Sequence, residues 1–134
     1  MTTVGFIGLG AMGRPMVENL GKAGFAVQSY DKNGSGTHKS AAAAAKGADI
    51  LVTMLPNGGV VREALLDALP SIKRGALVID MSSADPAGTR ALGAALEASG
   101  IELMDAPVSG AVAGARAATL AIMVGGSTSA LARG

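Results

Sequence analysis

Short apolar runs alternate along the chain with longer segments whose apolar residues recur at helical spacing. The short runs are rich in Val, Ile and Leu, which is typical of strands buried on both faces of a parallel sheet. The predicted strands are Thr3–Ile7, Phe25–Tyr30, Ile50–Leu55, Ala76–Met81, Ile101–Met104 and Leu120–Val124. The predicted helices are Arg14–Ala23, Ser40–Lys46, Val60–Leu69 and Pro86–Ala98.

Glycine and proline mark the ends of several of these elements. Pro15 falls in the first turn of a predicted helix, where a missing N–H costs little, and Gly24 follows the last turn. The alternation of strands and helices indicates βαβ units, which assemble into a mostly parallel sheet. We therefore expect residues 1–134 to form a single α/β domain, a size that buries a real core.

Composition and charge exclude several classes of protein. The chain is 49% apolar with a net charge of +1 and no basic block, so neither disorder nor a nucleic-acid surface is expected. It contains no cysteine, which excludes disulfides and thiolate metal sites, and we expect no metal centre. No apolar run approaches the roughly 20 residues of a membrane span, and the N-terminus does not resemble a signal peptide. A soluble, cytoplasmic protein without a membrane partner is expected.

The segment GFIGLGAMGRPM at positions 5–16 has three glycines in the spacing G-x-G-x-x-G. It follows a predicted strand and begins a helix, which is the context of a dinucleotide-binding loop. In such a loop Gly8 permits the tight turn, Gly10 lets a pyrophosphate approach the backbone, and Gly13 lets helix and strand pack closely. The N-terminus of the helix then offers free N–H groups to the phosphates. The alternative is a glycine turn without a ligand.

Asp31 follows the second predicted strand, about 20 residues after the glycines. An acidic residue at this place binds the ribose hydroxyls of NAD, and its charge repels the 2′-phosphate of NADP. The alternative is that Asp31 only begins the turn DKNG, as aspartate often does. The neighbouring Lys32 weakens the exclusion of NADP, so NAD is the expected cofactor and NADP remains possible.

Three later segments, TMLPNG at 53–58, DMSSADP at 80–86 and DAPVSGAVAGA at 105–115, begin where predicted strands end. Ligands of open parallel sheets bind beyond the carboxyl ends of the strands, so these segments are expected to face one crevice. Asn57, Ser82, Ser83 and Ser109 supply polar side chains for it. Each serine has an alternative interpretation as a helix N-cap or a turn residue.

Together these motifs resemble the 3-hydroxyisobutyrate dehydrogenase family of β-hydroxyacid dehydrogenases. That family includes tartronate semialdehyde and glyoxylate reductases and is related to 6-phosphogluconate dehydrogenase. The resemblance covers nearly the whole chain. It implies a Rossmann-type, doubly wound sheet with helices on both faces, and an NAD(P)-dependent oxidoreductase that interconverts a small 3-hydroxy acid and its semialdehyde.

The resemblance also assigns site residues. The implied cofactor-binding residues are Gly8, Leu9, Gly10, Ala11, Met12, Gly13, Asp31, Leu55, Pro56 and Ser83. Ser83 corresponds to a position near the nicotinamide, while Ser109 and Gly110 correspond to the residues that bind the substrate carboxylate.

The chain departs from the family pattern in its length, in the segment after Asp31, and at Ala111 and Ala118, where glycine is usual. Full-length members continue into an all-helical second domain, which carries the catalytic lysine and mediates oligomerisation, so that lysine is expected beyond Gly134. The segment between Asp31 and Ile50 is shorter than in the family, which predicts the loss of one edge strand. No catalytic residue is therefore assigned within this chain, and a homo-oligomer remains possible.

Two classes of function stay open. The first is a hydroxyacid dehydrogenase, represented here by its cofactor-binding domain. The second is a noncatalytic dinucleotide-binding module or an inactive fragment. Turnover of small hydroxy acids would distinguish the two.

Overall fold

The computed structural model describes residues 2–56, 58–82, 86–106, 108–109 and 121–122. Its main strands are β1 (Thr3–Ile7), β2 (Ala26–Tyr30), β3 (Ile50–Thr53), β4 (Leu77–Asp80) and β5 (Glu102–Asp105). Its helices are α1 (Gly13–Lys22), α2 (Ala41–Ala45), α3 (Gly58–Ala68) and α4 (Pro86–Ala98), with a 3₁₀ turn at Leu69–Ser71. The elements predicted between residues 3 and 105 are all present, with shifts of one or two residues at most ends.

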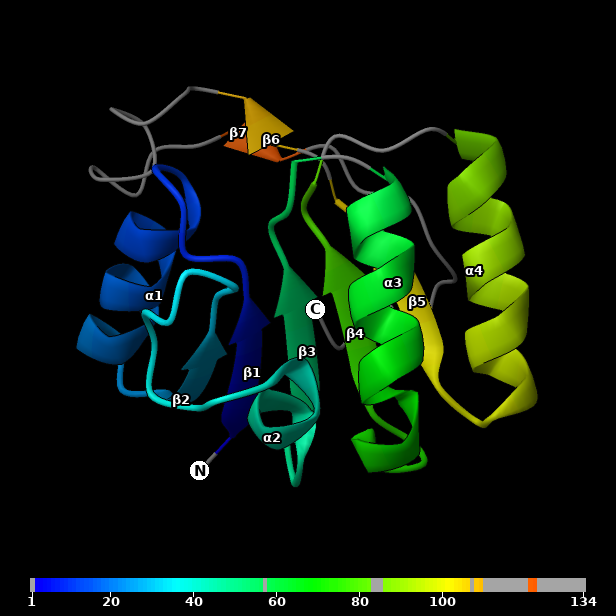
Figure 1. Ribbon diagram of the computed structural model, residues 1–134, viewed down its shortest axis with the longest axis horizontal. Coiled ribbons are helices and arrows are strands. Elements are labelled where there is room, and N and C mark those ends of the chain that lie inside the picture. The colour runs from blue at the N-terminus through cyan, green and yellow to red at the C-terminus, as the bar shows by residue number, and fades with distance from the viewer. Residues whose placement is uncertain (1, 57, 83–85, 107, 110–120, 123–134) are drawn as a thin grey trace.

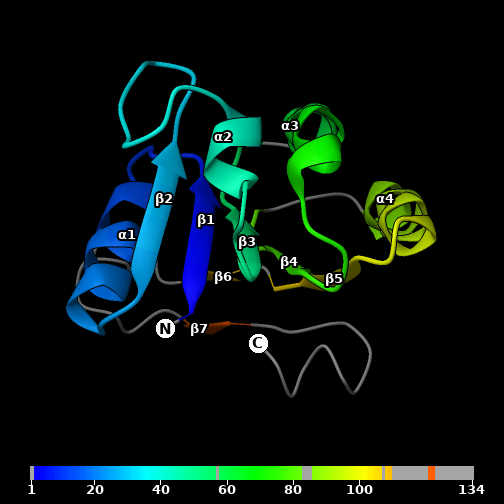
Figure 2. The same cartoon turned by 90° about the horizontal axis from the view of Figure 1, so that it is seen from below.

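The five strands form one parallel sheet in the order β2-β1-β3-β4-β5 (Figure 1). Helix α1 packs on one face, while α2, α3 and α4 cover the other, as the view from below shows (Figure 2). Helices on both faces of an open parallel sheet define the doubly wound, Rossmann-type fold, so the predicted fold class is confirmed.

Alternate residues of each strand point to opposite faces and bury two apolar clusters. On the side of α2, α3 and α4, Leu51 and Val78 pack with Leu65 of α3 and Leu96 of α4. On the side of α1, Phe6 of β1 is fully buried in a second cluster. Two buried faces explain why the strands read as continuous apolar runs in the sequence.

Strand β2 lies at one edge of the sheet, and the described residues contain no strand beyond it. The chain returns from β2 to β3 through a loop and the single short helix α2, which confirms the predicted loss of an edge strand. The loop covers part of the open edge: the Ser29 N–H donates to Thr37 Oγ1 (3.0 Å), and the Ser29 carbonyl accepts from the His38 N–H (2.9 Å). Exposed backbone groups of an edge strand invite pairing with another chain, and here the loop satisfies two of them.

Of the predicted strand at Leu120–Val124, the structure describes Ala121 and Ile122, which do not join the parallel sheet. These two residues form β7 (Ala121–Ile122), which pairs antiparallel with β6 (Val108–Ser109). In Figure 1 this small sheet lies toward the carboxyl ends of the parallel strands. The apolar pattern predicted a strand there but not which strand it pairs with. An antiparallel pair can form without a crossover helix, so a helix between the strands could not indicate the partner.

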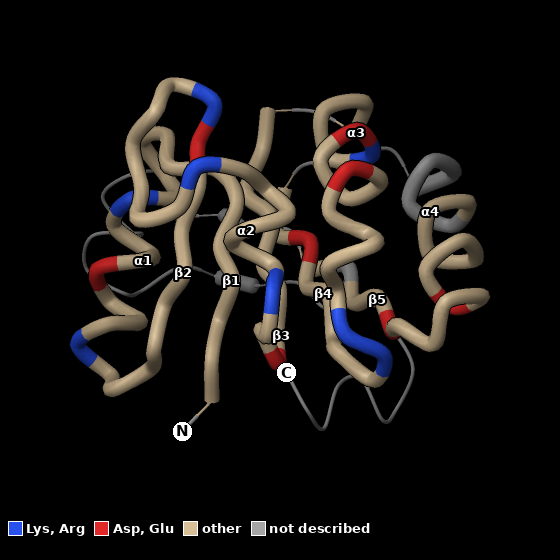
Figure 3. The backbone as a smooth tube through the Cα atoms, turned by 60° about the horizontal axis from the view of Figure 1, so that its bottom comes forward, with Lys and Arg blue, Asp and Glu red and all other residues tan. Residues whose placement is uncertain are grey.

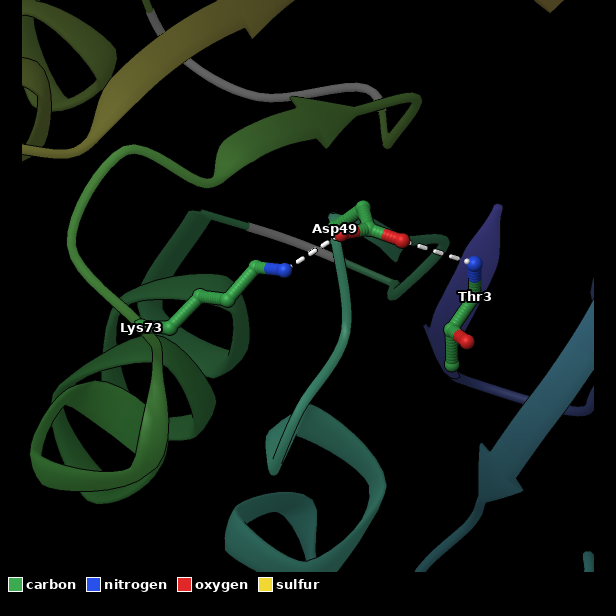
Figure 4. Close-up of polar contacts among 3 residues, drawn as sticks. All are labelled: Thr3, Asp49 and Lys73. Carbon is green, nitrogen blue, oxygen red and sulfur yellow. Dashed lines mark hydrogen bonds and ion pairs between the residues drawn. The ribbon is translucent and has the colours of Figure 1, made fainter. Parts of the chain in front are cut away.

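At the amino ends of the strands, Asp49 joins three parts of the fold (Figure 4). Its Oδ2 accepts the Thr3 N–H (2.9 Å), and its Oδ1 binds Lys73 Nζ in an ion pair between partly exposed side chains. The hydrogen bond from Lys73, followed by that from the Thr3 backbone, lowers the pKa of Asp49 below its ordinary value. This contact joins the start of β1 to the start of β3 at the amino ends of the strands, whereas the glycine loop lies at the carboxyl ends.

Basic and acidic residues are interspersed along the backbone (Figure 3). In the part of the chain drawn in colour, they form no continuous basic stripe of the kind that binds nucleic acid. None of the described helices has both the length and the apolar character needed to cross a bilayer.

Candidate functional site

The connections that leave the neighbouring strands β1 and β3 run on opposite faces of the sheet. Helix α1 follows β1 on one face of the sheet, and α3 follows β3 on the other. This change of face is the topological switch point of the sheet, where the loops after two neighbouring strands separate and leave a crevice. The glycine loop 8–13 follows β1, and residues 54–56 follow β3 (Figure 1), so both segments begin at this switch point, where Gly8 approaches Met54 and Leu55.

Gly8 and Gly13 are required by close packing within the loop. Gly8 has a φ of +108°, and a Cβ on it would lie 2.2 Å from the carbonyl oxygen of Met54. A Cβ on Gly13 would lie 1.8 Å from the carbonyl oxygen of Gly8. These contacts allow the tight turn after β1 and the close approach of α1 to that turn, as the sequence predicts.

Gly10 lies in a different environment. It is exposed, and a Cβ placed on it would meet no described heavy atom within 4 Å. Neither packing nor a positive φ accounts for a glycine at this position. The bare backbone faces open space, which suits a ligand that must come close to the main chain.

The first turn of α1 has no side-chain cap. Its N-cap residue is Met12, whereas Ser40 caps α2 by accepting the Ala43 N–H at 3.0 Å. An uncapped first turn leaves backbone N–H groups and the positive end of the helix dipole available to an anion. A cavity of about 560 Å³ opens beside this turn, lined by Leu9, Gly10, Ala11, Arg14, Pro15 and Glu18.

Asp31 forms the predicted turn and also contacts the glycine loop, while its ribose-binding role stays a prediction. Its Oδ1 accepts the Asn33 N–H (3.0 Å), and its carbonyl accepts the Gly34 N–H (3.1 Å), so the DKNG turn forms. Its Oδ2 accepts the Leu9 N–H at 2.6 Å, which holds the carboxylate against the glycine loop. Each carboxylate oxygen has a second lone pair, so the half-buried side chain retains acceptor capacity for hydroxyl groups.

Leu55 and Pro56 follow β3 beside the glycine loop. The Leu55 side chain lies 3.1 Å from the position that a Cβ on Gly8 would occupy, and Pro56 is exposed. The Met54 N–H donates to the Ile7 carbonyl (2.9 Å), which extends the β1–β3 pairing to the edge of the crevice. The structure therefore brings Met54 and Leu55 next to Gly8, as expected where the loops after β1 and β3 form two walls of one site.

Ser82 was expected among the crevice-lining side chains, and this expectation is wrong. Ser82 is fully buried, and its Oγ accepts the Leu55 N–H at 2.7 Å. Its own N–H donates to Oδ1 of Asp80, which also accepts the hydroxyl of Thr53 at 2.9 Å. A buried hydroxyl group needs hydrogen-bond partners within the protein, and here residues at the ends of the strands supply them.

Thr53 and Asp80 also belong to this network and were not predicted as site residues. Each is the last residue of an apolar strand, and they are register partners on β3 and β4. A polar residue at the same final position of two neighbouring buried strands is the signal that would have identified them.

Other predicted positions receive no structural description. Asn57, Ser83 and Gly110 lie outside the described residues, and Ser109 is described only as a backbone position opposite Ala121 in β6. Lys73 is bound to Asp49 at the opposite edge of the sheet, so it does not face the crevice. Among the described side chains, no group of three or more His, Asp or Glu residues is arranged to hold a metal ion.

Comparison with known families matches residues 3–134 to the NAD binding domain of 6-phosphogluconate dehydrogenase. Among curated proteins, a probable 3-hydroxyisobutyrate dehydrogenase of Mycobacterium tuberculosis is 44% identical over 143 residues, covering 99% of this chain and 49% of that protein. An NAD-dependent L-serine dehydrogenase of Pseudomonas aeruginosa is 40% identical, covering 98% of this chain and 48% of that protein. The chain thus spans about half the length of the curated relatives it matches.

The structural comparison agrees with the sequence comparison. The solved structure of M. tuberculosis 3-hydroxyisobutyrate dehydrogenase with L-serine superimposes with a TM-score of 0.94 and 43% identity, covering 99% of this chain and 49% of that one. The sequence alignment with the M. tuberculosis protein is 143 residues long and exceeds the 134 residues of the chain. That relative therefore has residues in the matched region that this chain lacks, in agreement with the short connection between β2 and β3.

Proposed function

Because the chain belongs to the family of the NAD binding domain of 6-phosphogluconate dehydrogenase, we propose that its crevice binds a nicotinamide dinucleotide in one defined orientation. The pyrophosphate lies on the glycine loop and the first turn of α1. The observation that carries this proposal is Gly10, an exposed glycine that nothing in the described packing requires. A side chain there would occupy the space through which the phosphates reach the N–H groups of residues 10–13.

Asp31 orients the adenosine half of the dinucleotide. Its carboxylate is fixed at the end of β2 by the Leu9 N–H, and its remaining lone pairs accept the ribose hydroxyls. The same negative charge repels a 2′-phosphate, so we propose NAD as the preferred cofactor, with NADP as a weaker ligand. Leu9, Ala11, Met12, Leu55 and Pro56 complete the walls around the dinucleotide.

With adenosine at β2 and pyrophosphate at β1, the nicotinamide half extends over the ends of β3 and β4. By family resemblance, Ser83 contacts this half, and Ser109 and Gly110 bind the carboxylate of the substrate. We propose that residues 1–134 form a single cofactor-binding domain, in which these residues orient cofactor and substrate rather than transfer protons.

For the complete enzyme we propose the reversible oxidation of a small 3-hydroxy acid to its semialdehyde. The bound cofactor supplies hydride chemistry, and the protein supplies binding and orientation. The described lysines do not match the acid–base lysine of the family, which the resemblance places in the part of the relatives that this chain does not match. We propose the cytoplasm, where dinucleotide cofactors are available, as its location. A noncatalytic dinucleotide-binding module remains the second candidate, because the chain spans only half of its relatives.

Titration with NADH tests the proposed site. In Gly10→Val the new side chain blocks the pyrophosphate without meeting the fold, so we expect the thermal unfolding profile to persist and NADH affinity to fall at least about 10-fold. The matched control is Gly21→Val in helix α1, away from the loop, because a Cβ there also meets no described atom within 4 Å. Equal NADH affinity of Gly10→Val and Gly21→Val would refute the assignment of the loop.

A further inference from the structure

A buried polar network joins the ends of β3 and β4 beneath the crevice. Asp80 is 1% exposed, and its Oδ1 accepts both the Thr53 hydroxyl at 2.9 Å and the Ser82 N–H at 3.0 Å. Ser82 Oγ in turn accepts the Leu55 N–H at 2.7 Å and lies 3.4 Å from the Thr53 carbonyl, to which it donates. A buried carboxylate is costly unless it is fully hydrogen-bonded, so this arrangement fixes the groups around it.

The network ends at the wall of the candidate cofactor site. Leu55 is the second residue after β3, and its N–H is held by the side chain of Ser82 rather than by a neighbouring strand. The Leu55 side chain lies against Gly8, as does the Met54 carbonyl. Asp80 itself lies below the loop and does not line the cavity described beside α1. Its effect on a ligand therefore passes through Ser82 and Leu55.

We propose that Asp80, Thr53 and Ser82 are positioning residues, which hold the loop after β3 against the glycine loop so that it receives the nicotinamide half of the cofactor. This inference rests on the proposed dinucleotide site. It assigns the adenosine half to the ends of β1 and β2, whereas the side chains of the network lie at the ends of β3 and β4. Loss of the network should therefore weaken NADH, which spans both halves, and leave the binding of ADP nearly unchanged.

The same three residues would also contribute to packing, and Thr53 separates the two roles. Thr53→Val keeps the side-chain volume and removes the hydroxyl, whereas Thr53→Ser keeps the hydroxyl and removes a methyl group. A packing role makes Ser the more harmful substitution, because it leaves a small cavity. A positioning role makes Val the more harmful one, because Asp80 loses a hydrogen bond in a buried site.

The experiment measures the Kd of the 134-residue chain for NADH and for ADP by calorimetry. We expect Thr53→Val to raise the NADH Kd about fivefold to tenfold and to change the ADP Kd less than about twofold, while Thr53→Ser binds both ligands nearly as the parent does. Thr3→Val makes the same substitution at the amino end of β1 and serves as the control. If Thr53→Val does not fold, Ser82→Ala with Ser99→Ala as its control gives the same comparison of the two ligands.

The outcomes distinguish a failure of the positioning role from a failure of the proposed dinucleotide site. An equal loss for NADH and ADP in Thr53→Val, no loss for either ligand, or a greater NADH loss in Thr53→Ser than in Thr53→Val, would overturn the positioning role and leave the cofactor site intact. If the parent chain binds neither NADH nor ADP, the dinucleotide site is refuted and, with it, this inference.

Discussion

Asp31 directs its two carboxylate oxygens to different neighbours, the Asn33 N–H in its own turn and the Leu9 N–H in the glycine loop. A turn-forming aspartate needs only the first of these contacts. The second fixes the charge beside the site proposed for the pyrophosphate. One side chain thus links the end of β2 to the loop after β1, and the turn and the ligand role need not exclude each other.

Cofactor preference is predicted at this residue. Asp31→Ser removes the charge that repels a 2′-phosphate, so we expect the preference for NADH over NADPH to narrow by about 5- to 30-fold. The ratio of the two Kd values, measured for parent and variant by titration, is the test. A parent chain that binds NADPH more tightly than NADH would contradict the prediction and would make Lys32 the candidate phosphate ligand.

A pH dependence is predicted at Asp49. The pKa of its carboxyl is lowered in the folded chain, chiefly by the hydrogen bond from Lys73, so the contact stabilises the fold above the ordinary pKa of aspartate, about 4. That stabilisation is lost as the pH falls from there through the lowered pKa. We expect Asp49→Asn to be less stable than the parent at pH 7 and the difference to shrink in acid. Urea unfolding of both chains across this range is the measurement, and a difference that does not depend on pH would contradict the role of the charge.

At the scale of elements, the packing of α1 on the turn after β1 depends on Gly13. A Cβ at this position would meet the Gly8 backbone at 1.8 Å, so Gly13→Ala must displace either the helix or the turn. We expect a loss of about 1–3 kcal/mol or more of unfolding free energy. Gly10→Ala in the same loop meets open space and should change stability by about 0.5 kcal/mol at most. Similar denaturation midpoints for the two variants would show that the close approach is not required.

Element type and order were predictable because the central strands bury both faces and the longer helices have apolar residues at helical spacing. Phe6 and Leu65 belong to patterns that stay visible within a few neighbouring residues. The burial of Ser82 was not predictable in this way, because its partners Leu55 and Thr53 are 27 and 29 residues away. Those contacts depend on the register of β3 against β4, which a local pattern does not contain.

In the glycine loop, too, only part of what the sequence predicted can be compared with the structure. Its spacing predicted three distinct roles, and the packing around Gly8 and Gly13 agrees with two of them. The third role, approach of a ligand at Gly10, stays a prediction, because it depends on a molecule outside the chain.

For the whole molecule, we predict that the chain binds the cofactor but turns over hydroxy acids slowly. It spans about half of its relatives, and loss of an acid–base group alone typically lowers rates by about 10²–10⁴-fold. Any orientation supplied by the half of those relatives that this chain does not match would be absent as well, which lowers the rate further. The kcat/KM of the chain, beside that of a fusion to the remaining half of a relative, is the measurement. Comparable kcat/KM for the chain and an active fusion would contradict it, and cofactor binding without turnover by either would favour the noncatalytic module.

A structure of the chain with NAD⁺ tests the central claim most directly. The account predicts the pyrophosphate within hydrogen-bond distance of the backbone N–H groups of residues 10–13. It also predicts the adenosine ribose hydroxyls on the Asp31 carboxylate and the nicotinamide over the ends of β3 and β4. A dinucleotide bound away from the glycine loop, or none bound at a saturating concentration, would contradict it.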